Sequence, residues 1–225
     1  MFVGHYAPSF LAKRLDPGIP LWLLFLAVQL LDVFWAIFIF IGVERVRIVP
    51  GFTETNALDL YYMPYTHSLP GALAWAAAAA ISYRLLTGSS RGGALVGAAV
   101  FSHWPLDLLV HRPDLALYDD AAKVGLGLWD YPYLTLALEG ALLLGAMGLY
   151  MSRSPPLTRR GRLSMPAFGL AILLMQGGML FSPPPPSERA MAITALVAYA
   201  LFAAAIAWLE RGRAVEERPP GGASD

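Results

Sequence analysis

Residues 19–43 read IPLWLLFLAVQLLDVFWAIFIFIGV and set the fold class of this 225-residue chain. Gln29 and Asp32 are the strongly polar side chains in this stretch, and a helix needs about 20 apolar residues to cross the hydrocarbon core of a bilayer. The whole chain is 57% hydrophobic and 14% charged, whereas soluble domains carry roughly 25% charged residues. We therefore expect a polytopic integral membrane protein whose partner is the lipid bilayer.

Several further apolar stretches are long enough to span a membrane, which predicts an all-α bundle of about six transmembrane helices. The six expected spans are residues 19–43, 69–88, 92–111, 131–151, 164–182 and 190–209. Ser68 and Ser164 precede Pro70 and Pro166 at the start of two spans, as expected of helix N-caps followed by a first-turn proline. Pro105 lies inside the third span and predicts a kink.

The basic residues fall in alternate loops of this arrangement and predict its orientation through the positive-inside rule. They are Lys13, Arg14, Arg84, Arg91, Arg153, Arg159, Arg160, Arg162, Arg211, Arg213 and Arg218. We expect a bacterial inner-membrane protein with both termini on the cytoplasmic side. The net charge of zero gives no indication of a nucleic-acid partner.

Residues 1–211 are expected to form one transmembrane domain, with the functional groups in residues 1–140 and supporting helices in residues 164–209. Residues 212–225 are rich in Pro, Gly, Glu and Arg, which predicts a disordered cytoplasmic tail. Residues 2–15 are apolar but too short to span. They could form an amphipathic helix on the membrane surface, or a half-inserted helix within the bundle.

Histidines and carboxylates inside the apolar stretches are the groups that an ordinary core does not explain. Ionisable side chains in a span are costly, face the bundle interior and are functional by default. Because the chain has no cysteine, any bound metal must sit on nitrogen and oxygen. The residues concerned are His5, Asp32, His67, His103, Asp107, His111 and Glu139.

The sharpest local pattern is His103-x3-Asp107-x3-His111. Positions i, i+4 and i+8 advance by about 40° per step around a helix, so the three side chains line one stripe. Two ligands at i and i+4 can hold one ion, but i to i+8 covers about 12 Å, so His111 would serve a second ion or a substrate. The alternative is a polar stripe satisfied by neighbouring helices.

Estimated depths place five of these groups in one band of the bilayer. At a rise of about 1.5 Å per residue, Asp32 and Asp107 lie about 20 Å from the inner ends of their spans. Glu139 lies about 18 Å up, and a half-inserted N-terminal segment brings His5 to about 12 Å. Separate structural roles, such as a neutral Asp32 bonded to Gln29, would not produce a common depth, so the depths indicate one shared site.

Four short motifs resemble the membrane-bound metal-dependent hydrolase family, which includes a LexA-regulated inner-membrane protein of enteric bacteria. They occur in the family's order: Gly4-His5, Leu30-Leu31-Asp32, Thr66-His67-Ser68-Leu69 and Ser102-His103-x3-Asp107. The chain has a single Asp32 where the family shows a Pro-Asp-x-Asp-like segment. The family itself is distantly similar to the helical zinc-dependent phospholipase C. The resemblance implies that His5, Asp32, His67, His103 and Asp107 are metal ligands.

These observations predict a metal-dependent hydrolase that acts on a phosphoester or lipid-like substrate. The cofactor is a divalent metal, zinc or, if carboxylates dominate, manganese. Glu139 or Asp32 would act as general base on a metal-bound water, and His111 and Arg112 would bind an anionic head group. Two other functions fit the same residues: a metal-ion or proton transporter, and a non-catalytic membrane protein with a structural metal.

Overall fold

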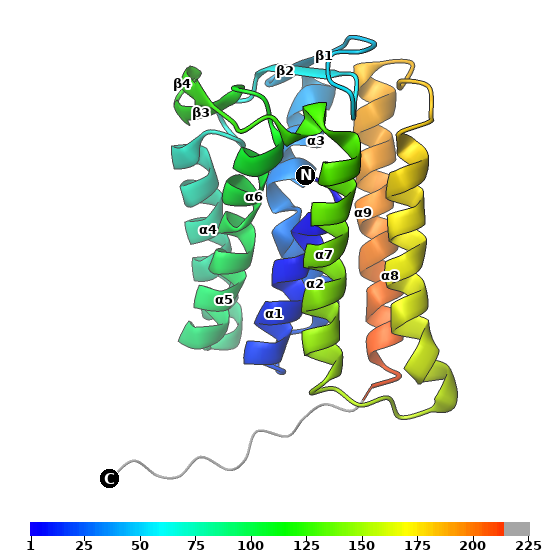
Figure 1. Cartoon of the computed structure of the whole chain (residues 1–225). Helices are drawn as coiled ribbons and strands as arrows, with labels where there is room; N and C mark the ends of the chain where they lie inside the picture. The colour runs from blue at the N-terminus through cyan, green and yellow to red at the C-terminus, as the bar shows by residue number, and fades with distance from the viewer. Residues whose placement is uncertain (214–225) are drawn as a thin grey trace.

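The structure, a computed structural model, describes residues 1–213, with Arg160 described without its side chain. Its long helices run side by side, and two short hairpins cover one end of the bundle, here called the hairpin end (Figure 1). The helices are η1 (Val3–Tyr6), α1 (Ala7–Leu15), α2 (Leu21–Val28), α3 (Leu30–Ile41), α4 (Leu69–Thr87), α5 (Ser90–Phe101), α6 (His103–Val110), η2 (Leu128–Asp130), α7 (Pro132–Met151), α8 (Arg159–Met179) and α9 (Glu188–Glu210). The antiparallel hairpins pair β1 (Arg45–Ile48) with β2 (Leu58–Tyr62) and β3 (Leu115–Tyr118) with β4 (Ala121–Val124).

Four segments of the described chain are long and apolar enough to cross a membrane: α4, α5 with α6 (Ser90–Val110), α7 and α9. The bent pair α2 and α3 makes a fifth if it is counted as one span. The helical class and the membrane character expected from the sequence therefore agree with the structure. A sixth span is not confirmed, because Arg162, Gln176 and several glycines lower the hydropathy of α8.

The first apolar stretch is broken at Gln29, where α2 and α3 meet at 55°. Gln29 is buried, and its Nε2 donates a hydrogen bond to the carbonyl of Phe2 at 3.3 Å. The break leaves the carbonyl of Val28 beside His103 Nδ1, 2.8 Å away, and puts Asp32 in the first turn of α3. The break at Gln29 thus accompanies two features of the site described below, the Val28 carbonyl beside His103 and the position of Asp32.

The third apolar stretch is also interrupted, at Ser102, between α5 and α6. Pro105 therefore lies in the first turn of α6 instead of kinking a continuous helix, and a first-turn proline leaves no intrahelical acceptor without a donor. The α5 half packs closely on α4, since a Cβ on Gly93 would lie 2.6 Å from the carbonyl oxygen of Ala80. Small residues that let helices approach closely are typical of membrane bundles.

The predicted cap of α4 is confirmed and that of α8 is wrong. Ser68 Oγ accepts a hydrogen bond from a first-turn amide of α4 at 3.1 Å, and Pro70 lies in that turn. In α8 the N-cap is Thr158, not Ser164, and Pro166 lies inside the helix. The apolar pattern begins at residue 164, but the helix extends through the preceding arginines, which have good helix propensity.

The N-terminal segment lies inside the bundle, which is the half-inserted arrangement of the two alternatives. Helix α1 packs against α7 and α2 near the middle of the molecule (Figure 1). His5 is fully buried, and Lys13 is 7% exposed. Lys13 Nζ donates to the carbonyls of Pro17 and Ile19 and forms a salt bridge of 2.5 Å with Glu210 Oε1. This bridge ties the end of α1 to the end of α9.

The basic loops lie together at the end of the bundle opposite the hairpin end. Figure 1 shows there the turn between α4 and α5, the loop between α7 and α8, and the end of α9. Gly212 closes onto this loop through a hydrogen bond from Leu157 N to its carbonyl (2.9 Å), and Arg213 pairs with Pro156. The rest of the predicted tail, residues 214–225, lies outside the described residues.

Candidate metal centre

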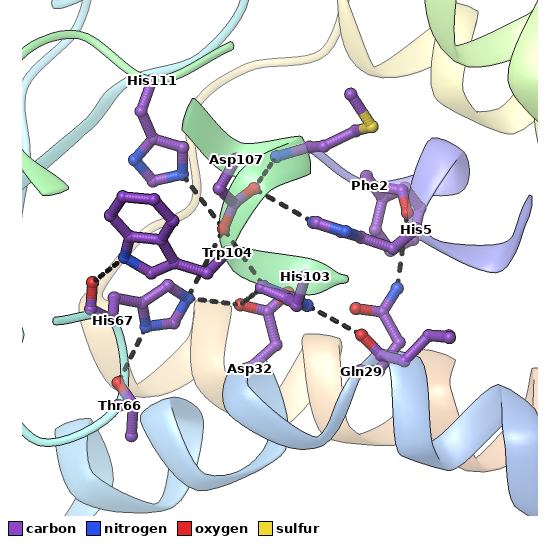
Figure 2. A network of polar contacts seen from close by, with 12 residues as sticks. Phe2, His5, Gln29, Asp32, Thr66, His67, His103, Trp104, Asp107 and His111 are labelled. Carbon is purple, nitrogen blue, oxygen red and sulfur yellow. Dashed lines mark hydrogen bonds and ion pairs between the residues drawn. The ribbon is translucent and has the colours of Figure 1, made fainter. Parts of the chain in front are cut away.

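All four histidines and two aspartates meet in one buried cluster at the level of η1 and α6 (Figure 2). His5 comes from η1, Asp32 from α3, His67 from the segment before α4, and His103 and Asp107 from α6, while His111 caps the end of α6. Each histidine and Asp107 is at most 3% exposed. The five metal ligands implied by the family resemblance and the separately reasoned His111 are therefore brought together.

Asp107 lies at the centre of the cluster. Its Oδ1 is 2.5 Å from the backbone nitrogen of Met1 and 3.0 Å from His5 Nε2. Its Oδ2 faces three imidazoles, with His103 Nε2 at 3.1 Å, His111 Nε2 at 3.5 Å and His67 Nε2 at 3.7 Å. The Asp107 carboxylate thus contacts both histidines of the His103-x3-Asp107-x3-His111 pattern. The helical spacing had predicted that His111 lies too far from His103 to share an ion with it.

Asp32 forms the second acidic corner. Its Oδ1 is 3.3 Å from His67 Nε2 and 3.5 Å from His103 Nε2. Its Oδ2 accepts a hydrogen bond from the Tyr199 hydroxyl at 2.9 Å. Tyr199, on α9, was not singled out from the sequence, although a buried tyrosine hydroxyl usually has a polar partner.

In His103 and His111, a hydrogen bond at Nδ1 indicates that this ring nitrogen carries a proton. His103 Nδ1 faces the carbonyl of Val28 at 2.8 Å and His111 Nδ1 faces Asp114 Oδ1 at 2.7 Å. Both oxygens only accept, so each Nδ1 donates. The Nε2 atoms of both rings face the carboxylates of the cluster, the arrangement of metal-binding histidines whose other nitrogen is held by an outer partner.

His67 is held by a longer chain of hydrogen bonds. The Thr66 hydroxyl donates to Glu44 Oε2 at 2.7 Å and therefore accepts from His67 Nδ1, also at 2.7 Å. Glu44 Oε1 takes the backbone amides of Tyr65 and Thr66 at 2.8 and 2.9 Å. The indole of Trp104 donates to the His67 carbonyl at 3.0 Å. These contacts orient the ring with Nε2 toward Asp32 and Asp107.

This arrangement shifts the pKa values of two groups outside the spans, Glu44 and His111. Burial raises the pKa of the Glu44 carboxyl above its ordinary value, against the opposing influence of His67 and the hydrogen bonds from Thr66. Burial alone would lower the pKa of His111, but the carboxylates of Asp107 and Asp114 outweigh it and raise that pKa. The carboxylates of Asp107 and Asp114 therefore favour a positive charge at His111.

Two sets of side chains have the composition and spacing of a metal site: His5 with His103 and Asp107, and Asp32 with His67 and His103. In each set one ligand atom per residue lies within 4.8 Å of the others. His103 Nε2 is buried and makes no hydrogen bond of good geometry within residues 1–213, although carboxylate oxygens of Asp107 and Asp32 lie 3.1 and 3.5 Å away. Imidazole and carboxylate donors without thiolates suit zinc, and also manganese as carboxylates increase. The residues present therefore fit a divalent metal.

Glu139 lies beside the cluster and holds the N-terminal segment. Its Oε2 accepts the backbone amides of Phe2 and Gly4 at 2.9 and 3.0 Å, and Gln176 Nε2 lies 3.4 Å from its Oε1. Gln176 and Tyr199 show that α8 and α9 contribute to the site, whereas the sequence assigned these helices only a supporting role. Their partners are 37 and 167 residues away, so no local pattern could have revealed them.

A cavity of about 550 Å³ reaches the cluster. Asp32, His67, Asp107, His111 and Glu139 line it, together with apolar residues of α8, α9 and the proline-rich turn between them. The second residue predicted to bind an anion, Arg112, is not among its lining residues. Its guanidinium donates to the Phe52 carbonyl at 2.8 Å and lies 5.0 Å from the centre of that ring.

Comparisons with known proteins do not identify the site. No protein-family model matches the chain, and neither the curated proteins nor the solved structures contain a match. The interpretation of these residues as a metal centre therefore rests on their geometry.

Proposed function

We propose that this chain is an integral membrane hydrolase that holds a divalent metal ion between Asp32, His67, His103 and Asp107. The four imidazole-to-carboxylate separations among these residues are 3.1, 3.3, 3.5 and 3.7 Å. Ligand atoms at 2.0–2.2 Å from a tetrahedral zinc ion lie about 3.3–3.6 Å apart. The four separations bracket this range, and this closeness of buried imidazole and carboxylate atoms is the observation that carries the proposal.

The competing explanation is that protonated histidines neutralise the two aspartates without a metal. One contact argues against a fully protonated cluster. The rings of His5 and His103 stack with centroids 3.7 Å apart and planes 7° apart, and two imidazolium ions would repel each other at that distance. Outer partners engage Nδ1 of His67, His103 and His111, so in the neutral form of each ring the lone pair of Nε2 is available to a metal.

The cavity supports a hydrolytic role over a closed structural site, because an ion at the cluster would be reachable from it. A bound divalent ion supplies a water with a lowered pKa and polarises a substrate oxygen. Glu139 Oε1 has only the long contact with Gln176, so this oxygen can accept a proton. His111 lines the cavity and can contact an anionic group of the substrate.

The family resemblance and the membrane placement belong to the same proposal. We assign the basic end to the cytoplasm of a bacterial inner membrane, which puts both the N-terminal segment's basic end and α9's end inside. The hairpin end then faces outward. The substrate is a phosphoester, for which a metal with His and Asp ligands is suited.

The test is metal analysis of the detergent-purified protein, combined with hydrolysis of a soluble phosphodiester. We expect roughly one or two ions per wild-type chain and their loss in Asp107→Asn, which keeps the side-chain shape and removes the charge. Asp59→Asn is the matched control, because Asp59 pairs with Arg47 on β1, outside the cluster. A wild-type chain that binds no ion after zinc or manganese loading refutes the proposal. Metal passage into liposomes without hydrolysis would instead assign the centre to transport.

A further inference from the structure

The cavity extends away from the metal centre along two helices. Met175 and Met179 of α8 line it, as do Ala195 and Ala198 of α9. The charged lining residues, among them Asp107 and His111, belong to the cluster or lie beside it, and most of the remaining wall is apolar. The cavity therefore suits an amphipathic ligand, with a polar group at the cluster and an apolar part along the remaining wall.

Small side chains on α9 create this space. Ala190, Thr194, Ala195 and Ala198 line the cavity at helical spacing, so one stripe of α9 offers little volume opposite the long methionines of α8. Met175 and Met179 line the cavity and are still 38% and 55% exposed. Part of the cavity wall on α8 is therefore accessible from outside the bundle, and α8 and α9 run side by side (Figure 1).

Part of the cavity lining lies within the length of the α9 span. Thr194 is exposed, lines the cavity and lies six residues after the start of α9, which is about 9 Å along the axis. In a bilayer, an exposed lining residue at this depth faces the acyl chains and not bulk water. Methionines suit a wall that must adapt to a flexible apolar chain.

The polar end offers a donor that no protein group satisfies. Trp35 is 5% exposed and lines the cavity, and its Nε1 has no hydrogen-bond partner in the described structure. Its ring packs edge-on against His67 with centroids 6.2 Å apart. A buried N–H without an acceptor is costly, so an oxygen of the bound molecule is its natural partner.

We propose that the substrate is a membrane lipid with a phosphodiester head, whose apolar chain lies between α8 and α9 while the phosphoryl group reaches Trp35, His111 and the metal centre. This inference rests on the proposed hydrolase function and specifies its substrate class. In the reaction the water oxygen bonds to phosphorus, and the ester P–O bond breaks. The leaving oxygen takes up the proton that Glu139 accepted from the water.

Two synthetic probes with the same reacting group test the chain site. They are methyl p-nitrophenyl phosphate and hexadecyl p-nitrophenyl phosphate, both presented to the zinc-loaded protein in detergent micelles. We expect kcat/KM to be at least about tenfold higher for the hexadecyl probe, the effect of burying only two methylene groups. Ala198→Phe should abolish this preference by lowering kcat/KM for the hexadecyl probe to that of the methyl probe.

The matched control is Ala200→Phe, an exposed position on the same helix that does not line the cavity. It should retain the preference. Equal kcat/KM for the two probes in the wild type, or equal loss on both in Ala198→Phe with metal retained, overturns the chain site and leaves the hydrolase standing. If Ala198→Phe does not fold, the wild-type comparison alone decides.

A binding measurement separates failure of the inference from failure of the function. Phosphatidylcholine carrying a diazirine in its acyl chain is cross-linked to the protein in nanodiscs, and the adducts are mapped. We expect adducts at Met175 and Met179 that Ala198→Phe removes and Ala200→Phe keeps. If neither probe is hydrolysed but these adducts form, the hydrolase is refuted and the chain site stands. If Ala198→Phe leaves the adducts unchanged, the chain site is refuted.

Discussion

Replacing Thr66 by valine should weaken metal binding without removing any proposed ligand. The Thr66 hydroxyl joins Glu44 Oε2 and His67 Nδ1 through two hydrogen bonds of 2.7 Å each. Valine has nearly the same shape but no hydroxyl, so the imidazole of His67 keeps its space and loses the contact that fixes its tautomer and orientation. All three groups lie in a buried region.

Outer partners of metal-binding histidines are worth about 10- to 100-fold in affinity, which is about 1.4–2.8 kcal/mol. We expect Thr66→Val to fall in this range. Glu44 remains held by the backbone amides of Tyr65 and Thr66, so the loss is centred on His67. The metal-free protein should also lose about 1–3 kcal/mol of stability, because a buried donor and acceptor are left unpaired.

The assay is competition for zinc against a chromophoric chelator, with the purified protein in detergent. Thr87→Val is the matched control, because Thr87 bonds to the Tyr83 carbonyl and the Ser89 amide at the turn between α4 and α5, at the opposite end of α4 from His67, and loss of its hydroxyl should leave the affinity unchanged. A dissociation constant for Thr66→Val within about twofold of the wild-type value would refute the reasoning that His67 binds metal through Nε2.

Three further changes probe other parts of the site. Tyr199→Phe removes the hydrogen bond to Asp32 Oδ2 and should weaken zinc binding by about two- to tenfold in the same competition assay; an unchanged affinity would show that this oxygen needs no orienting partner. Glu139→Gln should retain the metal and lower kcat on a phosphodiester by about 10²- to 10⁴-fold, whereas loss of the metal would mean that Glu139 acts only by holding the N-terminal segment. Lys13→Met leaves Glu210 without its cation and should lower stability by about 3–5 kcal/mol, seen as a lower Tm, with the metal content of the folded fraction unchanged; an unchanged Tm would show that α1 is held by packing alone.

Much of the architecture could be predicted because a bilayer imposes simple requirements on a sequence. Long apolar stretches must become helices in hydrocarbon, and this identified most of the helices that are long and apolar enough to cross a membrane. Ionisable groups in such helices face the bundle interior and pair with one another. This requirement predicted that one site would contain His5, Asp32, His67, His103 and Asp107. The short hairpins were not anticipated, because strands of four or five residues leave little periodicity to detect.

The remaining features depend on contacts that no local pattern contains. The break at Gln29 accompanies a hydrogen bond to Phe2 across 27 residues, so the long apolar stretch gave no sign of it. Arg112 follows His111 directly, but α6 has ended and His111 is extended, with ψ of 147°. The chain therefore turns away, and helical spacing no longer predicts where Arg112 points.

The inserted position of η1 and α1 has a consequence for how the protein is made. Asp107 meets His5 across 102 residues, and Glu210 holds the start of α2 across 189. The residues of η1, α1 and α2 therefore find some of their native partners only after α6 and α9, which follow far along the chain, have been synthesised. The proposed metal centre would then assemble late in biogenesis, because Asp107 lies in α6 and Asp32 is held by Tyr199 of α9.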